Sequence, residues 1–251
     1  MDTIPVTSTP PAPPPAPAPA ATAPARAAPV ARIRLRDAAL ISLAVATGAI
    51  DAISWLGLGK VFSAFMTGNL AFVGFDIGGA DGPPVVRTLV ALAAFAVGAA
   101  VAARVVRTEK AQSLWPPRVT LALVLVLVLE IAFLAVWAPV GSDPSTAVGD
   151  VLVAISAAAM GVQTIAIFSL GVKASFTTAA TATLAVLMGD LAQWTAVREE
   201  RVRLILLLLA IVGGAALGAL LVDQAYGWAP VLPLLITGAV IVAAVRVTRR
   251  G

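Results

Sequence analysis

Six runs of about 20 apolar residues, each long enough to cross the roughly 30 Å hydrocarbon core of a bilayer, limit what this chain can fold into. The bilayer interior offers the backbone no hydrogen-bond partners, so each run must form a helix that satisfies its own peptide groups. Hydrophobic residues make up 60% of the sequence and charged residues 12%, which excludes an ordinary soluble domain. We therefore expect an all-α integral membrane protein with six transmembrane helices, at Ala38–Leu58, Pro84–Val105, Val119–Trp137, Val151–Leu170, Leu204–Val222 and Val231–Val247.

The first thirty-one residues differ from the rest of the chain in composition. They contain ten of its eighteen prolines, mixed with alanine, serine and threonine. Proline has no amide hydrogen and interrupts helices, so this segment cannot build a helix or a core. We expect residues 1–31 to form a disordered cytoplasmic tail and residues 32–251 to form the membrane domain.

Basic residues help to place two shorter segments, 62–77 and 176–190, which are barely long enough to span. If both segments enter the membrane and return on the same side, fifteen of the seventeen basic residues are cytoplasmic and only Lys60 and Arg87 are outside. If both cross, the split is eleven to six. The positive-inside rule favours the first arrangement, with two re-entrant half-helices and both termini cytoplasmic. Full crossing of the two segments is the alternative.

The chain also contains an internal duplication. Residues 62–76 align without a gap with residues 176–190, at an offset of 114, and Phe, Thr, Leu, Ala and Asp recur in register. With the re-entrant arrangement, two units of about 37–139 and 146–247 have the same order of segments but start from opposite sides of the membrane. Such an inverted repeat can expose a central binding site alternately to either side, which favours a transporter.

The residue types present exclude most catalytic chemistry. The chain has no cysteine and no histidine, so it has no disulfide, no thiolate nucleophile and no imidazole to act as a base or metal ligand. It also lacks a Gly-x-Ser-x-Gly nucleophile motif and a Walker-type phosphate loop. The high sequence pI, about 10.3, comes from basic clusters beside apolar runs, where membrane topology explains them. We expect no enzyme activity, no cofactor, no metal site and no nucleic-acid partner.

Polar residues interrupt both copies of the duplicated segment. Thr67, Gly68 and Asn69 precede the apolar stretch Leu70–Ile77, where they are placed to cap the amino end of a half-helix. Such an end presents unpaired N–H groups and the positive pole of the helix dipole, and two of them could converge on a polar or anionic ligand. The alternative is that these side chains only satisfy backbone groups where the segment turns. The substrate-binding candidates of the second copy are Thr177, Thr178, Thr181 and Thr183.

Two carboxylates lie within the expected spans. Glu130 is near the centre of its span, and Asp51 is about two turns, or roughly 10 Å, from the outer end of the first span. Such residues usually face the bundle interior and mark proton or ion pathways, because a charge at the bilayer centre costs roughly 2.5–3.5 kcal/mol. We predict that Asp51 and Glu130 are proton-coupling candidates, that Asp51 also binds substrate, and that Gln163 is its uncharged counterpart in the second unit. The alternative for each carboxylate is a neutral acid hydrogen-bonded between helices.

Several of these residues occur in a combination that is known from other proteins. The segments Asp51-Ala52-Ile53-Ser54, Met66-Thr67-Gly68-Asn69-Leu70, Gly161-Val162-Gln163 and the later Thr177-Thr178…Thr181 run together resemble the YoaK family of bacterial inner-membrane proteins. The resemblance covers roughly residues 35–250 and implies a multi-span protein of the bacterial inner (plasma) membrane, in a family with no established substrate. Its members commonly carry a Thr-Gly pair where this chain has Thr181-Ala182, which argues against a glycine hinge at that position.

Two hypotheses for function follow. The first is a secondary transporter of a small polar or anionic solute, with the lipid bilayer and an unknown small molecule or ion as its partners. The second is a non-transporting membrane scaffold or regulatory protein, in which the polar residues serve packing alone. The sequence leaves homo-oligomer formation open.

Overall fold

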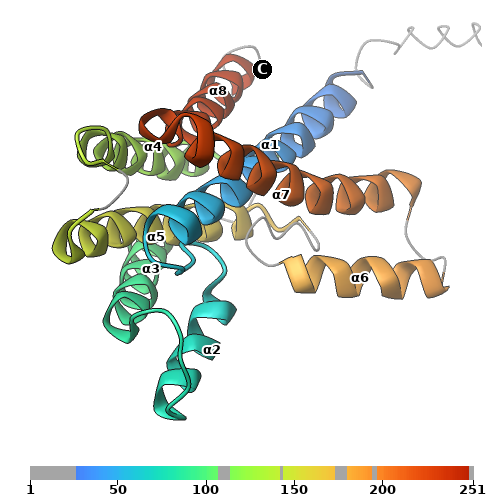
Figure 1. The fold of residues 1–251 in the computed structure, drawn as a ribbon. Coiled ribbons are helices and arrows are strands. Elements are labelled where there is room, and N and C mark those ends of the chain that lie inside the picture. Colours follow the sequence, from blue (N-terminus) through green and yellow to red (C-terminus); the bar gives the residue numbers. More distant parts are fainter. Residues whose placement is uncertain (1–26, 107–113, 142–143, 173–179, 194–196, 249–251) are drawn as a thin grey trace, which may run out of the picture.

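The structure is a computed structural model that describes residues 27–106, 114–141, 144–172, 180–193 and 197–248 (Figure 1). These residues form helices joined by turns and contain no strand, which confirms the expected all-α class. The helices are α1 (Ala27–Gly57), α2 (Met66–Ile77), α3 (Val85–Val105), α4 (Pro117–Trp137), α5 (Thr146–Phe168), α6 (Ala180–Gln193), α7 (Arg198–Gln224) and α8 (Val231–Thr248), with a short 3-10 turn η1 (Tyr226–Trp228) before α8.

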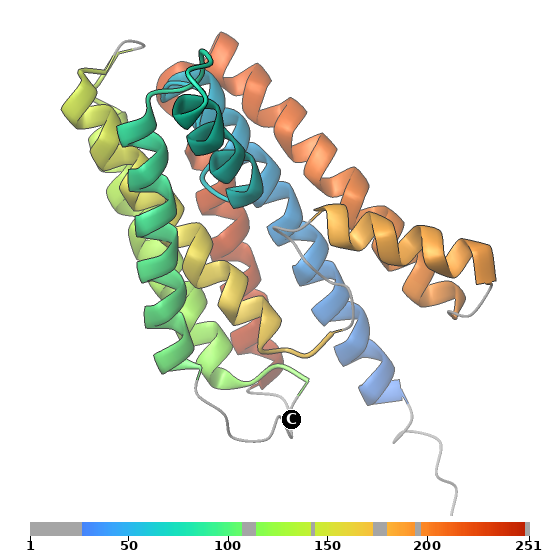
Figure 2. The same ribbon diagram turned by 90° about the horizontal axis from the view of Figure 1, so that it is seen from below.

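Six helices are long and apolar enough to cross a membrane, as the sequence predicts: α1, α3, α4, α5, α7 and α8. The other two, α2 and α6, have 12 and 14 residues. At 1.5 Å per residue they are about 18 and 21 Å long, which is shorter than the hydrocarbon core. Figure 1 shows them on the flanks of the bundle rather than at its centre, and Figure 2 shows α6 extending from one side.

Three helices begin before the apolar runs that identify them. The observed and expected first residues are Ala27 and Ala38 for α1, Thr146 and Val151 for α5, and Arg198 and Leu204 for α7. Polar and charged residues can continue a helix where it leaves the hydrocarbon, since their side chains reach the headgroups or water. Hydropathy therefore marks the membrane-embedded part of a helix and not its full length. Residues 1–26 of the expected tail lie outside the described residues, whereas residues 27–31 form the start of α1, so for them the prediction of a disordered tail is wrong.

Two helix pairs make the most extensive contacts, α1 with α7 and α3 with α5. Glycines bring the backbones together at both crossings. A Cβ added to Gly214 would lie 2.0 Å from the carbonyl oxygen of Val45, and one added to Gly161 would lie 2.2 Å from that of Phe95. α4 then packs on α5, and α8 packs on α1 and α4. Small residues thus set the closest helix contacts, as is usual between membrane helices.

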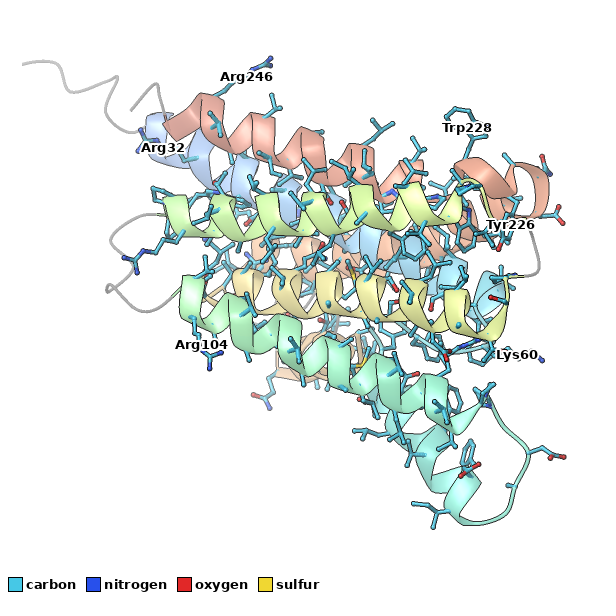
Figure 3. The ribbon with its side chains drawn as sticks, turned by 90° about the vertical axis from the view of Figure 1, so that its left-hand side faces the viewer. Arg32, Lys60, Arg104, Tyr226, Trp228 and Arg246 are labelled. Carbon is cyan, nitrogen blue, oxygen red and sulfur yellow. The ribbon has the colours of Figure 1, made fainter. Side chains whose placement is uncertain are left out.

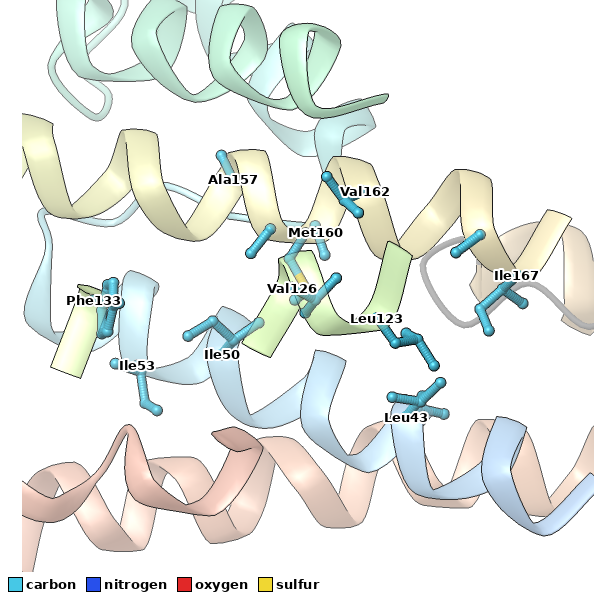
Figure 4. Close-up of a cluster of buried hydrophobic side chains, with 14 of the residues drawn as sticks. Leu43, Ile50, Ile53, Leu123, Val126, Phe133, Ala157, Met160, Val162 and Ile167 are labelled. Carbon is cyan, nitrogen blue, oxygen red and sulfur yellow. The ribbon is translucent and has the colours of Figure 1, made fainter. Parts of the chain in front are cut away.

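Polar and apolar side chains are arranged as a bilayer requires. Large apolar side chains such as Val212, which is 67% exposed, face outward, whereas Thr47 and Gln163 are fully buried. Lipid can cover the outward side, and buried polar groups must find partners inside the protein. An apolar core fills the space where α1, α4 and α5 meet (Figure 4). The chain is a multi-pass membrane protein.

The two ends of the bundle differ in charge. Figure 3 shows Arg32, Arg104 and Arg246 at one end, which we call the basic end, and Lys60 and Trp228 at the other, which we call the Lys60 end. Charged residues at the ends of membrane helices lie at the level of the lipid headgroups.

A hydrogen bond shows where the chain goes between α1 and α3. Nη1 of Arg87, at the start of α3, donates to the carbonyl oxygen of Leu58, just after α1, at 3.0 Å. The end of α1 and the start of α3 therefore lie side by side at the Lys60 end. The segment that contains α2 leaves this end and returns to it.

Candidate functional site

Asp51 holds the loop between α1 and α2 inside the bundle. Its Oδ1 accepts hydrogen bonds from the backbone N–H groups of Ser63 and Ala64, both at 2.7 Å, and its Oδ2 accepts one from that of Phe65 at 3.2 Å. The carboxylate group is buried within the protein. Bonds between a carboxylate and backbone N–H groups are stronger than neutral ones. Asp51 therefore caps the segment that leads into α2.

Asn69 fastens the same loop from α2. Its Oδ1 accepts a hydrogen bond from the N–H group of Phe62 at 3.0 Å, and its Nδ2 donates to the carbonyl oxygen of Phe62 at 2.7 Å. Gly68 leaves room for the Phe62 ring, since a Cβ at Gly68 would lie 2.9 Å from two ring atoms. Thr67 is exposed instead. This motif therefore has an anchoring side, formed by Gly68 and Asn69, and an outward side, formed by Thr67.

The start of α2 differs from the sequence prediction. The sequence places Thr67, Gly68 and Asn69 before the helix as capping residues, but α2 begins at Met66 and takes them into its first turn. Phe65, at the N-cap position, makes no capping hydrogen bond with its side chain. Asp51, from another helix, instead binds the backbone N–H groups of the three residues just before α2. Local spacing could not reveal this, because the carboxylate that holds the loop comes from a different part of the chain.

Two serines connect the loop to the middle of α5. The hydroxyl groups of Ser63 and Ser156 lie 2.6 Å apart, and both residues are buried. The hydroxyl of Ser156 also donates to the carbonyl oxygen of Val153 at 3.1 Å. A hydroxyl has one hydrogen to donate, so with this bond in place Ser63 is the donor to Ser156. Sequence reasoning missed both serines, since single serines in apolar or alanine-rich segments form no motif.

Gln163 lies where α5 passes α1. Its Nε2 donates to Oγ1 of Thr47 at 2.9 Å, and its Oε1 has no hydrogen-bond partner in the part of the protein described here. Thr47 in turn donates to the carbonyl oxygen of Leu43 at 2.9 Å. The hydrogen bond of Gln163 thus reaches α1 one turn before Asp51.

Glu130 is in the middle of α4, and only 4% of its surface is exposed. Its Oε1 accepts a hydrogen bond from Oγ1 of Thr237, on α8, at 3.1 Å. No described residue forms a hydrogen bond with its Oε2. A cavity of about 10 Å³ lies against this side chain, which is close to the space that one water molecule needs. Sequence reasoning had identified Glu130 but not Thr237, an isolated polar residue in an apolar run.

The candidates of the second copy lie on another flank. Thr181 is exposed and Thr183 is buried, both on α6, while Thr177 and Thr178 lie outside the described residues. α6 packs on α7 and α2 packs on α3, and Figures 1 and 2 show the two short helices apart. In this structure the described polar residues of the two copies therefore do not form one site.

An ion pair joins helices at the Lys60 end. Nε of Arg87, on α3, lies 2.7 Å from Oδ1 of Asp150, on α5. Nη2 of the same arginine donates to the carbonyl oxygen of Thr146 at 3.1 Å. With the bond to Leu58 already described, Arg87 ties together the ends of three long helices.

Ion pairs also join helices at the basic end. Nη1 of Arg203, on α7, lies 3.7 Å from Oδ2 of Asp37, on α1. Nε of Arg201 lies 2.8 Å from Oδ2 of Asp190, on α6. The sequence gives no signal for these pairings, since the partners come from different helices.

The polar side chains of the candidate site can form hydrogen bonds or carry one charge each. The described residues include no group of three or more His, Cys, Asp and Glu side chains that could hold a metal ion. The buried polar groups are hydroxyls, amides and carboxylates, of which Asp190 is paired with Arg201. Such groups can bind a small polar molecule or one charge.

Comparisons with known proteins agree with this architecture. Residues 39–243 match the family model described as "Protein of unknown function (DUF1275)". The chain is similar to the UPF0700 transmembrane protein YoaK of Bacillus subtilis (strain 168), with 35% identity over 156 residues, which cover 62% of this chain and 67% of that protein. No solved structure matches the chain. The resemblance to the YoaK family is thereby confirmed, and the chain belongs to the DUF1275 family of multi-pass membrane proteins.

Proposed function

We propose that the protein is a secondary transporter of a small polar solute, and that its two units act as inverted repeats. The observation that carries this proposal is the presence of two corresponding ion pairs, Arg87–Asp150 and Asp37–Arg203, at opposite ends of the bundle. Alternating access requires that one end opens while the other stays closed. One ion pair at each end of the bundle could hold that end closed, as such a cycle requires.

The correspondence between α1 and α5 is supported by sequence and by burial. Asp37 and Asp150 are 113 residues apart, and so are Gly48 and Gly161. At every position from 37 to 54 the side chain is buried, half-buried or exposed to the same degree as the side chain 113 residues later. Two helices with the same pattern of burial occupy equivalent environments.

The correspondence between α3 and α7 has an offset of 116. In this register Arg87 matches Arg203, and Gly98 matches Gly214. A Cβ at either glycine would lie only 2.1 or 2.0 Å from a carbonyl oxygen of the facing helix. Each unit therefore contributes one arginine and one aspartate, and each ion pair joins the two units.

The distance between the ion pairs matches the membrane. One pair includes Asp37 near the start of α1, and the arginine of the other bonds Leu58 just beyond its end. At 1.5 Å per residue, the helix between residues 37 and 58 is about 30 Å long. This is close to the thickness of the hydrocarbon core.

We further propose that the basic end faces the cytoplasm of a bacterium, that both termini lie there, and that α2 and α6 are re-entrant. Lys60 and Arg87 are the described basic residues of the Lys60 end. The helix ends at the basic end carry Arg32, Arg34, Arg36, Arg104, Arg118, Arg198, Arg201, Arg203 and Arg246. The positive-inside rule supports this orientation for the inner membrane.

We place the solute beside the loop before α2, where Asp51, Thr67 and Ser156 come from three helices. Asp51 already occupies the N–H groups of Ser63 and Ala64. An anionic solute would have to displace this carboxylate, whereas a neutral polar solute would not. We therefore favour a neutral solute with hydrogen-bonding groups.

A non-transporting scaffold is the alternative, and one observation favours it. Asp51 and Asn69 bond to the backbone of the loop that they hold, which is what a packing role requires. The two functions differ in whether the ends of the bundle open in turn.

Cysteine labelling can test alternating access without knowledge of the solute. The chain has no cysteine, so Ser156→Cys places a single thiol in the buried centre. We expect Arg87→Gln to increase its labelling by an impermeant reagent from outside, and Arg203→Gln to increase its labelling from the cytoplasmic side in inverted vesicles. Each substitution removes an ion pair that closes one end.

Lys60→Gln and Arg104→Gln are matched controls, because each removes a charge from the same end without breaking a described ion pair. Both should leave the labelling unchanged. Labelling from the same side in the two arginine variants, or no labelling in either, would contradict alternating access and support the scaffold.

The orientation has a separate test. Single cysteines at positions 110 and 198 should be protected from impermeant reagent in intact cells, and a cysteine at position 80 should be labelled. The reason for position 80 is that the segment that contains α2 begins and ends at the Lys60 end, which the charge distribution places outside. Labelling at 110 with protection at 80 would reverse the orientation.

A further inference from the structure

The cavity beside Glu130 lies between α1, α4, α5 and α8. Its walls include Ile50, Phe133 and Met160, which Figure 4 shows in the apolar core, together with Glu130, Ser156 and Pro233. It is large enough for one water-sized particle, at about 10 Å³. Too small for a metabolite, it can hold only a single water or a small ion.

The carboxylate of Glu130 has few partners for a charged group in this position. Thr237 bonds Oε1, and no described residue bonds Oε2. Among the described residues that line the cavity, Glu130 alone can carry a charge. Pro233, on the wall formed by α8, has no amide hydrogen to donate. An ionised carboxylate in hydrocarbon with a single hydrogen bond is unfavourable unless a positive charge joins it.

We propose that this cavity is a binding site for one monovalent cation, held between Oε2 of Glu130 and the hydroxyl oxygen of Ser156. The shared chemistry is a single positive charge, which is either a proton on the carboxylate or an ion of about the size of sodium. Ser156 can take part because a hydroxyl oxygen has two lone pairs, and its bond from Ser63 uses one of them.

The position of the site explains how a cation could influence the loop. Ser156 contacts the cavity on one side and Ser63 on the other, and Ser63 is bonded through its N–H group to Asp51. A cation at Glu130 is therefore one hydroxyl away from the loop that precedes α2. On α5 and α8 the charged groups Asp150 and Arg246 lie at the helix ends, and on α1 Asp51 faces the loop.

This inference deepens the proposed transport role by naming the class of coupling ion. Its test measures binding to the purified full-length protein, whereas alternating access is tested by labelling. A negative result in the binding experiment therefore does not change the interpretation of the labelling experiment, and the reverse also holds.

The test compares the parent protein with Glu130→Gln in detergent. At constant ionic strength, sodium chloride replaces choline chloride at pH 8, and in a second series without sodium the pH is lowered from 9 to 5. The readouts are the midpoint of thermal unfolding and the intrinsic tryptophan fluorescence, to which Trp137 contributes with the four other tryptophans. The ring of Trp137 stacks on that of Phe133, with 5.5 Å between their centroids. A ligand that binds the folded state raises the midpoint, and above its dissociation constant the rise grows with the logarithm of the ligand concentration.

We expect the parent to be stabilised by sodium or by protons relative to Glu130→Gln, which is neutral and should respond to neither through this site. A rise of the midpoint with sodium at pH 8, together with a fluorescence change that saturates, identifies a sodium-sized ion, and Ser156→Ala should then require more sodium. A response to pH alone identifies a proton. Asp76→Asn, an exposed carboxylate variant on α2, should keep the parent response.

Identical responses of the parent and Glu130→Gln in both series would overturn the proposal. If Glu130→Gln does not fold, Thr237→Val provides a second comparison, because it keeps the carboxylate but removes its one hydrogen-bond donor. The half-maximal response should then occur at a lower cation concentration than in the parent. An unchanged concentration dependence in Thr237→Val would equally overturn the site.

Discussion

Gly214→Ala should destabilise the protein strongly, while Gly213→Ala, one residue earlier on α7, should leave it unchanged or slightly more stable. A Cβ at Gly214 would lie 2.0 Å from the carbonyl oxygen of Val45 and 2.8 Å from its carbonyl carbon. These are backbone atoms of α1, so no side chain can rotate out of the way. α1 and α7 would have to separate along their contact.

The expected loss is about 1–3 kcal/mol or more, as for other substitutions that overpack a tightly packed contact. Gly213 has nothing within 4 Å of the added carbon, and alanine gains roughly 0.5–1 kcal/mol over glycine in a helix interior. Thermal unfolding in the same detergent, followed by circular dichroism, measures the difference. Equal midpoints for the two variants would show that the α1–α7 crossing is looser than the structure indicates.

Gly161→Ala should have a comparable effect at the other crossing. Its Cβ would lie 2.2 Å from the carbonyl oxygen of Phe95, on α3. Similar losses at Gly161 and at its counterpart Gly48, whose Cβ would lie 2.1 Å from the carbonyl oxygen of Ile211 on α7, are expected if α3–α5 and α1–α7 are equivalent pairs. A large loss at one and none at the other would weaken the inverted repeat.

Asp51→Ala should release the loop before α2 and have the second large effect. It removes the acceptors of three backbone N–H groups, those of Ser63, Ala64 and Phe65. A buried donor left without a partner costs about 1–3 kcal/mol. Hydrogen exchange should rise at residues 63–66 before it rises in α5, and the unfolding midpoint should fall.

The loss of stability in Asp51→Asn should be smaller than that in Asp51→Ala but larger than zero. One amide oxygen can still accept from Ser63 and Ala64, which share Oδ1, but the amide nitrogen then faces the N–H group of Phe65. Asp76→Asn is the control, since Asp76 is exposed on α2. Normal exchange in the loop of Asp51→Ala would show that this carboxylate does not hold it. Asp51→Asn therefore changes both the hydrogen bonds of the loop and the charge at position 51. A transport defect in this variant can be assigned to the charge only if hydrogen exchange in the loop is normal.

For the two candidate carboxylates, residue type and position within a span were enough to predict burial but not hydrogen-bond partners. Burial of Asp51 and Glu130 was predictable, because each is acidic within an apolar run long enough to span. Their partners were not. Ser63 lies 12 residues from Asp51, and Thr237 lies 107 residues from Glu130. The register of the proposed repeat also needed the structure, since the burial match at 113 residues places Thr164, and not Gln163, opposite Asp51.

The sequence by itself determined the helical class and the six long spans, because hydropathy and helix formation depend on residues that are close together in the chain. It also revealed the repeated Thr-bearing segments. Only the tertiary structure decided what holds the loop before α2, which arginine pairs with which aspartate, and where a cavity meets Glu130. Each of these depends on side chains from different helices, and their approach is set by glycine contacts between backbones, such as that of Gly214 with Val45, which no local pattern specifies.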